Sequence, residues 1–290
     1  MTNDLFEQAA KLIASADGLL ITAGAGMGVD SGLPDFRGQE GFWKAYPALA
    51  EARVSFTAIA NPYAFFKNPK QAWGFYGHRL ALYRKTVPHA GFHTLKSIAN
   101  NLPNGAFVIT SNVDGQFQKA GFAESKMYEI HGSIHHLQCT QPCRESVWSG
   151  DLINPTTDDS RCEWIGNHLP ICDRCKKLAR PNILMFDDGV WIDNRARVQQ
   201  SAWLNWADQA SNIVVIEIGA GVGIPSIRRI SKAQGCPVIR INPRDFSLQE
   251  GAGVSLPIGA KEALQKISLA LSELGFLNSP VKEERKADEK

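Results

Sequence analysis

The chain has 290 residues, of which 44% are hydrophobic, so it can form one large domain, or one domain with a small module, around a packed core. Its formal net charge of +2 excludes the basic surplus that nucleic-acid binding by charge would need. The sequence has no apolar run of membrane-spanning length and no basic, apolar leader at its start, so a cytoplasmic protein is the default expectation. In that compartment the six cysteines are metal ligands or free thiols rather than disulfides.

The first glycine-rich turn is the most informative segment of the chain. After a helix predicted over residues 4–14, the apolar residues 18–21 predict a buried strand. The strand leads into Gly24-Ala25-Gly26, where bare backbone N–H groups can approach a phosphate because no Cβ stands in the way. The next glycine, Gly28, stands one place early for the dehydrogenase fingerprint, and no acid follows at the ribose-binding distance. Alone, the segment indicates either a nucleotide site or a structural turn.

A second strand is predicted further along, after a helical region. Residues 62–88 are rich in aromatic side chains and predict a small helical lobe packed on the main sheet, and a helix over 93–100 leads to an apolar strand at 107–110. The polar residues Ser111, Asn112 and Asp114 follow directly, at the sheet edge where parallel sheets bind ligands. For Asn112 and Asp114, a helix N-cap is the alternative interpretation.

Four cysteines stand in two short-spaced pairs, CxxxC and CxxC: Cys139, Cys143, Cys172 and Cys175. Four thiolates from two turns provide the tetrahedron that zinc prefers, and they leave no open position for water, so the predicted zinc is structural. The surrounding residues 135–185 show little periodicity and need a metal to hold them. The substitute ligands would be Cys162 first, then His135, His136 and His168, whereas Cys236 is interpreted as core.

Two more apolar runs, 212–218 and 237–242, predict buried strands. The first ends in a second glycine turn, Gly219-Ala220-Gly221. Strands that alternate with helices predict an α/β fold with a doubly wound parallel sheet of the Rossmann type. The charged tail, residues 278–290, is expected to be disordered.

In chain order, these motifs resemble those of the sirtuins, the NAD-dependent protein deacylases. The matching segments are GAGMGVDSGLPDFRG at 24–38, TSNVD at 110–114, IHG at 130–132, the four cysteines, RPNILMF at 180–186, IGAGVGIP at 218–225 and IN at 241–242. The resemblance implies one catalytic domain over residues 1–277 with NAD as co-substrate and a structural Zn²⁺. Its expected parts are Rossmann-type segments at 1–40, 89–134 and 186–277, a helical lobe at 41–88 and a zinc module at 135–185.

The resemblance also implies roles for individual residues. His131 matches the general base of the family, which suits a side chain with a reference pKa of about 6.5. Asn112 and Asp114 match the pair that holds the ribose and nicotinamide end of NAD during catalysis. The other implied cofactor-binding residues are Gly24, Ala25, Gly26, Asp35, Phe36, Arg37, Ser111, Gly219, Ala220, Gly221 and Asn242. The implied substrate is an acyl-lysine protein or peptide, whose acyl oxygen attacks C1′ of the nicotinamide ribose as nicotinamide leaves.

Tyr76 and Arg79 match the Tyr-x-x-Arg feature of class III sirtuins, which remove succinyl and malonyl groups. Residues three apart share a helix face, so a phenol and a guanidinium there could hold the distal carboxylate of an acidic acyl group. The alternative is an aromatic core residue beside a surface arginine.

Several residues depart from the family pattern: Gly28, Ser111, Ala220-Gly221 and Asp187-Asp188. They keep two other functions open beside lysine deacylation. One is a different use of NAD, by an ADP-ribosyltransferase or an NAD hydrolase. The other is a module that senses NAD or ADP-ribose without turnover.

Overall fold

A six-stranded parallel sheet lies at the centre of the computed structural model, which describes residues 2–34, 38–251 and 253–278. The strand order is β11-β10-β9-β1-β2-β3, and each neighbouring pair is parallel. The strands are β1 (Gly18–Ala23), β2 (Ala106–Thr110), β3 (Met127–Glu129), β9 (Ile213–Ile218), β10 (Val238–Ile241) and β11 (Gly253–Leu256). The predicted α/β fold with a doubly wound parallel sheet is confirmed.

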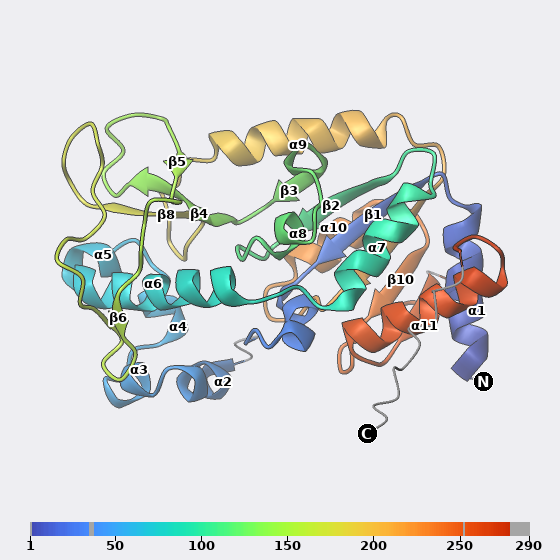
Figure 1. The fold of residues 1–290 in the computed structure, drawn as a ribbon, viewed down its shortest axis with the longest axis horizontal. Helices are drawn as coiled ribbons and strands as arrows, with labels where there is room; N and C mark the ends of the chain where they lie inside the picture. The colour runs from blue at the N-terminus through green and yellow to red at the C-terminus, as the bar shows by residue number, and fades with distance from the viewer. Residues whose placement is uncertain (1, 35–37, 252, 279–290) are drawn as a thin grey trace, which may run out of the picture.

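Helices cover both faces of this sheet (Figure 1). One face carries α1 (Thr2–Ser15), α7 (Ala90–Asn100) and α11 (Ala260–Glu273), which share a hydrophobic cluster with the strands. The other face carries α9 (Asn194–Ala207) and α10 (Ser226–Ala233), whose Trp206 and Ile227 pack on a second cluster. Coverage on both faces explains why β1 is buried along its whole length and reads as a continuous apolar run.

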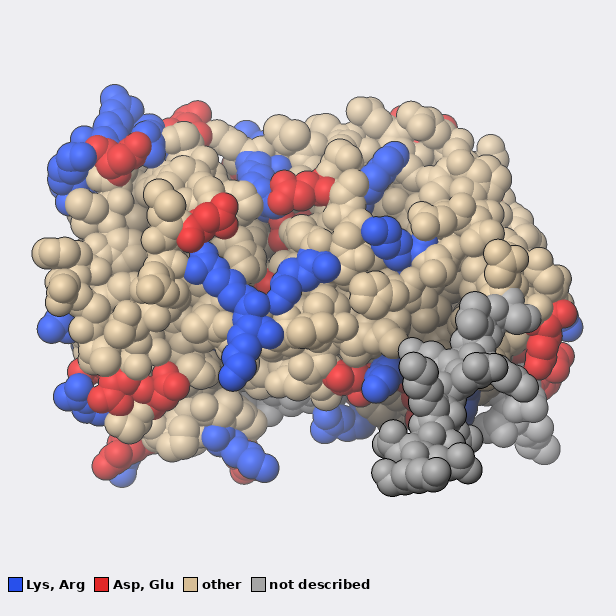
Figure 2. Space-filling model, in the orientation of Figure 1, with Lys and Arg blue, Asp and Glu red and all other residues tan. Residues whose placement is uncertain are grey.

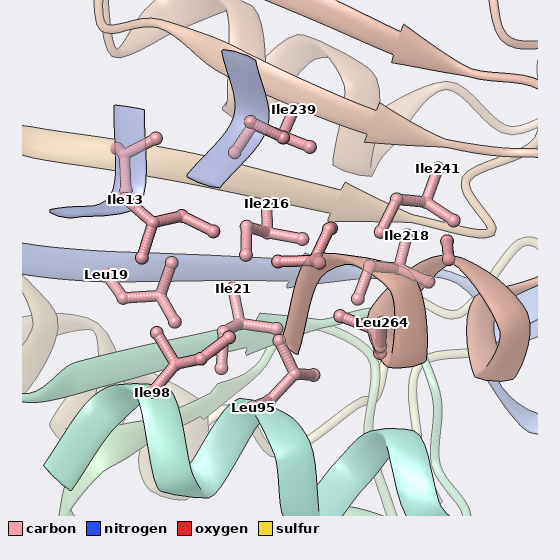
Figure 3. Close-up of a cluster of buried hydrophobic side chains, with 14 of the residues drawn as sticks. Ile13, Leu19, Ile21, Leu95, Ile98, Ile216, Ile218, Ile239, Ile241 and Leu264 are labelled. Carbon is pink, nitrogen blue, oxygen red and sulfur yellow. The ribbon is translucent and has the colours of Figure 1, made fainter. Parts of the chain in front are cut away.

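The main core lies between the sheet and the first group of helices. Figure 3 shows side chains from both layers pointing toward one another: Ile13, Leu19, Ile21, Leu95, Ile98, Ile216, Ile218, Ile239, Ile241 and Leu264. Burying each such side chain contributes about 1.5–3 kcal/mol to folding, so this layer contributes strongly to the stability of the sheet.

The helical lobe and the cysteine-containing module form the other end of the molecule (Figure 1). The lobe contains α2 (Gly38–Ala45), α3 (Pro47–Glu51), α4 (Phe56–Ile59), α5 (Ala64–Lys67) and α6 (Pro69–Lys85). The module is built on β4 (Gly132–Cys139), β5 (Trp148–Ser149), β6 (Thr157–Asp158), β7 (Glu163–Trp164) and β8 (Ala179–Ile183). Both contribute to one hydrophobic cluster around Trp73, Phe75 and Trp164, so the two insertions support each other.

Shorter elements complete the chain. They are two 3₁₀ helices, η1 (Ala25–Ser31) and η2 (Glu124–Lys126), and the single-turn α8 (Gln116–Lys119). The first glycine segment is thus a 3₁₀ helix rather than an open turn. Within the described residues, no helix combines the length and the apolar character that crossing a membrane requires. On the face drawn in Figure 2, basic and acidic side chains are interspersed among uncharged ones, in keeping with the net charge of +2.

Candidate active site

The strand order creates a crevice between β1 and β9. The chain continues from β1 to β2 on one side and from β9 to β10 on the other, so the connections of these two neighbouring strands lead in opposite directions. Ligands of open α/β sheets bind at such switch points, outside the carboxyl ends of the strands. Both predicted glycine segments lie there, because one follows β1 and the other follows β9.

The two glycine segments pack backbone against backbone. A Cβ at Gly26 would lie 2.6 Å from the Cα of Gly219, and one at Gly24 would lie 2.7 Å from the Gly219 carbonyl oxygen. Gly219 itself has φ +61°, a left-handed conformation that favours glycine. A Cβ at Gly221, in contrast, would meet no described atom within 4 Å. Three of these glycines are therefore required by the protein's own packing, whereas Gly221 leaves room for a ligand.

A cavity of about 710 Å³ lies over these segments and collects most of the predicted site. Its lining includes Gly24, Ala25, Gly26, Arg79, Ser111, Asn112, Asp114, His131, Gly219, Ala220 and Gly221. Tyr76 and Asn242 are not among the lining residues. Asp35, Phe36 and Arg37 fall outside the described residues. The cavity is also lined by residues that no sequence motif indicated, among them Phe56, Thr57, Tyr83, Ile227 and Asp245.

The side chains of Asn112 and Asp114 are both held by hydrogen bonds to the backbone at the end of β2. The Asn112 side chain donates from Nδ2 to the Gly24 carbonyl oxygen at 3.0 Å, which ties it to the first glycine segment and leaves its amide oxygen for a ligand. The Asp114 carboxylate accepts the Gln116 backbone N–H at 2.9 Å, just before α8. The N-cap of α8 is Gly115, with no side-chain cap, so Asp114 stands one residue before the cap and holds the turn that leads into the helix, and it also lines the cavity.

Burial shifts the pKa values of the two titratable groups in this cavity. Burial raises the pKa of Asp114 to about 6, against the lowering effects of the Gln116 N–H and the Arg79 charge. Burial lowers the pKa of His131, and a hydrogen bond to the Ser111 backbone opposes this. When one ring nitrogen of His131 donates to the Ser111 backbone carbonyl, the other ring nitrogen can accept a proton. At neutral pH the site therefore holds a neutral imidazole and a carboxylate.

Asn242 has a structural position beneath the second glycine segment. Its Nδ2 donates to the Ala220 carbonyl oxygen at 2.9 Å, and its Oδ1 accepts the backbone N–H groups of Arg244 and Asp245 at 3.0 Å. Arg228, on α10, also donates to the Ala220 carbonyl. The amide is 1% exposed and holds two turns in place, so the predicted ribose contact remains a prediction.

The turn after β8 explains one departure from the family pattern. Asp187 has φ +54°, in the left-handed region that Asp and Asn enter more readily than most residues other than glycine. Asp188 forms an ion pair with Arg180 at 2.8 Å, and both side chains are fully buried. The Asp188 carboxylate also accepts the backbone N–H groups of Met185 and Val190. These bonds fix the turn that brings Phe186 to the cavity.

The four predicted metal ligands come together in the module. The Sγ atoms of Cys139, Cys143, Cys172 and Cys175 all lie within 4.8 Å of one another. Four sulfurs around a tetrahedral zinc with Zn–S bonds of about 2.3 Å would be roughly 3.8 Å apart, so the donor set fits zinc. Cys162 is instead buried beside α6, where a Cβ on Gly74 would lie 2.2 Å from its carbonyl oxygen.

Removal of the metal is expected to unfold the cysteine-containing segment. The binding energy of a structural zinc is folding energy, on the order of 10 kcal/mol in small zinc domains. We expect Cys172→Ser to lose the bound zinc in metal analysis and to lose protection of residues 140–178 in hydrogen exchange. Cys236→Ser is the matched control and should keep both, because Cys236 lies beside β10 and outside the four-cysteine cluster. A Cys172→Ser protein with unchanged exchange would contradict this role of the metal.

Comparison with known proteins agrees with this geometry. The model of the Sir2 family matches residues 24–222, more than half of the chain, including both glycine segments. The chain belongs to the Sir2 family. The NAD-dependent protein deacylase of Aquifex aeolicus is 27% identical over 251 residues, which cover 86% of this chain and 93% of the relative. The NAD-dependent protein deacylase of Thermococcus kodakarensis is 30% identical over 262 residues, 89% of this chain and 93% of the relative.

Solved structures of other Sir2 proteins share the fold. A Sir2 homologue in complex with NAD superposes with a TM-score of 0.69 at 26% identity, covering 92% of this chain and 94% of the homologue. A point mutant of a Sir2 homologue in complex with ADP-ribose superposes with a TM-score of 0.68 at 25% identity, covering 92% of this chain and 96% of that one. The expected sirtuin resemblance is therefore confirmed at the level of family and fold.

Proposed function

We propose that this Sir2-family chain is an NAD-dependent protein-lysine deacylase that produces nicotinamide, O-acyl-ADP-ribose and free lysine. The observation that carries the proposal is the shared cavity: His131, Asn112 and Asp114 line the same space as both glycine segments. Relatives named NAD-dependent protein deacylase match almost the whole chain, which supports the same activity here.

Each part of the cavity has a task in this reaction. When bound, NAD supplies an activated ribose and nicotinamide as a leaving group. The backbone N–H groups of the two glycine segments suit the pyrophosphate, since they offer donors without side chains. The Asn112 amide oxygen and the Asp114 carboxylate can accept ribose hydroxyls or the carboxamide. The neutral imidazole of His131 takes the proton of the attacking ribose hydroxyl.

Product analysis separates the proposed function from its alternatives. One reaction with NAD and an acyl-lysine peptide is followed by mass spectrometry. A deacylase gives O-acyl-ADP-ribose and the unmodified peptide, whereas an ADP-ribosyltransferase gives a heavier protein or peptide. An NAD hydrolase gives ADP-ribose even without peptide, and a sensor gives no product. Any of the last three results would overturn the proposal.

The activity should decline on acidification with a midpoint near pH 6. His131 must be neutral, and its lowered pKa lies below the reference value of 6.5, whereas the Asp114 carboxylate is lost below its raised pKa of about 6. Both groups are in the active form at neutral pH, so the acidic limb of kcat/KM should reflect loss of the Asp114 carboxylate together with protonation of His131. In Asp114→Asn the limb should become shallower, because His131 alone then sets it. A limb centred above neutral pH, or one whose shape Asp114→Asn leaves unchanged, would contradict these roles.

The acyl preference that we propose is for acidic groups, succinyl or malonyl over acetyl. Arg79 supports this preference, because it is the one lysine or arginine among the described residues that line the cavity. Its guanidinium can bind a carboxylate through two parallel hydrogen bonds. An acetyl group has no distal carboxylate, so Arg79 adds no comparable binding energy for an acetyl-lysine substrate.

A further inference from the structure

Besides Tyr76, a second tyrosine of α6, Tyr83, lies beside Arg79, one helical turn further along the chain. Tyr83 stands four residues after Arg79, so both side chains lie on one helix face, and both line the cavity. The Arg79 guanidinium donates to the Tyr83 hydroxyl oxygen. The guanidinium carbon also lies 5.3 Å from the centre of the Tyr83 ring and 5.2 Å from the centre of the Phe75 ring. These contacts hold the guanidinium beside the Tyr83 hydroxyl.

The hydrogen-bond direction matters for the ligand. A phenol oxygen that accepts from Arg79 still has its own O–H proton to donate. The guanidinium and the phenol therefore offer separate donors side by side, which suits the two oxygens of one carboxylate. Asp114 lines the same cavity, and its negative charge opposes a second carboxylate, so a bound acidic acyl group needs both donors.

Tyr76 has a different environment although it also stands near Arg79 in sequence. Its ring stacks on Phe65 at 5.6 Å and makes an edge contact with Phe75 at 4.9 Å, inside the core of the helical lobe. It is not among the residues that line the cavity. Both tyrosines are buried, Tyr76 with 3% and Tyr83 with 4% of its surface exposed. The difference between them is that Tyr83 lines the cavity and Tyr76 does not.

We propose that Tyr83, rather than Tyr76, is the phenol that binds the distal carboxylate of the acyl group together with Arg79. This inference rests on the proposed deacylase function and names the residue that selects acidic acyl groups. It requires that the Tyr83 hydroxyl contribute to the binding of succinyl-lysine and contribute nothing to the binding of acetyl-lysine.

The test compares succinyl and acetyl versions of one peptide with wild-type, Tyr83→Phe and Tyr76→Phe proteins. A hydrogen bond to a charged group is lost in Tyr83→Phe, so kcat/KM for the succinyl peptide should fall roughly tenfold or more, through KM, with acetyl turnover unchanged. Tyr76→Phe should keep the wild-type succinyl-to-acetyl ratio. Loss of the ratio in Tyr76→Phe with retention in Tyr83→Phe would overturn the inference, and so would a wild-type protein that prefers acetyl.

A binding measurement keeps this test independent of turnover. In a His131→Ala background, calorimetry compares the affinity of each peptide with and without Tyr83→Phe. The inference predicts roughly tenfold weaker binding of the succinyl peptide alone. Equal affinities before and after the substitution would overturn it. If the wild-type protein turns over neither peptide but the predicted affinity difference is found, the proposed deacylation fails and the carboxylate site stands.

Discussion

Replacement of His131 by alanine is expected to lower deacylation at least about 100-fold, because a positioned general base contributes a factor of about 10²–10⁴ to the rate. The imidazole lines the cavity, and burial lowers its pKa against the raising effect of the Ser111 backbone, so a neutral ring can accept a proton. The loss should fall on kcat, measured by release of O-acyl-ADP-ribose in steady-state assays with saturating NAD.

Two controls make the result specific. Binding of ADP-ribose, followed as a thermal shift, should stay intact in His131→Ala, because the glycine segments that suit the pyrophosphate are untouched. His93→Ala should behave like the wild type, since His93 is exposed on α7 and lies outside the cavity. Deacylation at the wild-type rate in His131→Ala would remove the imidazole from the mechanism.

An added methyl group is expected to lower the stability of the protein at Gly219 and to weaken NAD binding at Gly221, two glycines of the same turn. In Gly219→Ala, the new Cβ would lie 2.4 Å from the Gly26 carbonyl carbon, at a residue with φ +61°. Left-handed strain and the clash together should cost roughly 2–5 kcal/mol, which lowers Tm by about 5–15 °C in a chain of this length. Differential scanning calorimetry measures this directly.

Gly221→Ala is the matched variant at the other end of that turn. Its Cβ meets no described atom within 4 Å, so Tm should stay near the wild-type value. Because Gly221 lines the cavity, the methyl group should instead weaken NAD binding, seen as a raised KM for NAD. Equal stability losses in the two variants would show that the turn does not pack on the first glycine segment as the structure has it.

The sequence was informative wherever the chemistry is local. The apolar run before Gly24 and the polar residues after Thr110 predicted the ends of two strands correctly, because a buried strand ends where its apolar run ends. The carboxyl ends of parallel strands lie at one edge of the sheet, so the candidate site residues were also predicted to lie together. The cysteine spacing predicted the metal cluster, because each short-spaced pair brings two sulfurs together within one loop. The predicted roles of the individual site residues stay predictions, although most of those residues line one cavity.

Other features depend on partners that are distant in the chain. The glycines at 24, 26 and 219 were interpreted as ligand-binding, but their contacts with each other arise only when β1 and β9 are neighbours. The hydrogen bond from Asn242 to the Ala220 carbonyl likewise arises only when β9 and β10 are neighbours. The buried pair Arg180–Asp188 is closer in the chain, but it forms only when the turn after β8 folds back on that strand. The sequence did not predict β11 or the helices α9 and α11, which have no chemical motif.

Tyr83 is the clearest residue that the sequence analysis missed. It stands among many aromatic residues of α6, and its packing there suits a core position as well as a cavity position. The signal that could have found it is the spacing of four from Arg79, which places a phenol and a guanidinium on one helix face. The spacing of three, from Tyr76, fits helical geometry equally well, so only the position of the cavity separates the two tyrosines.

A crystal structure of the protein with bound NAD, or with ADP-ribose and an acyl-lysine peptide, tests the central claim most directly. The claim is that one cavity brings the dinucleotide to His131. The account predicts the pyrophosphate against residues 24–26 and 219–221, with the nicotinamide ribose within hydrogen-bond reach of the His131 imidazole. A dinucleotide bound outside the crevice between β1 and β9, or an imidazole with no path to that ribose, would contradict it.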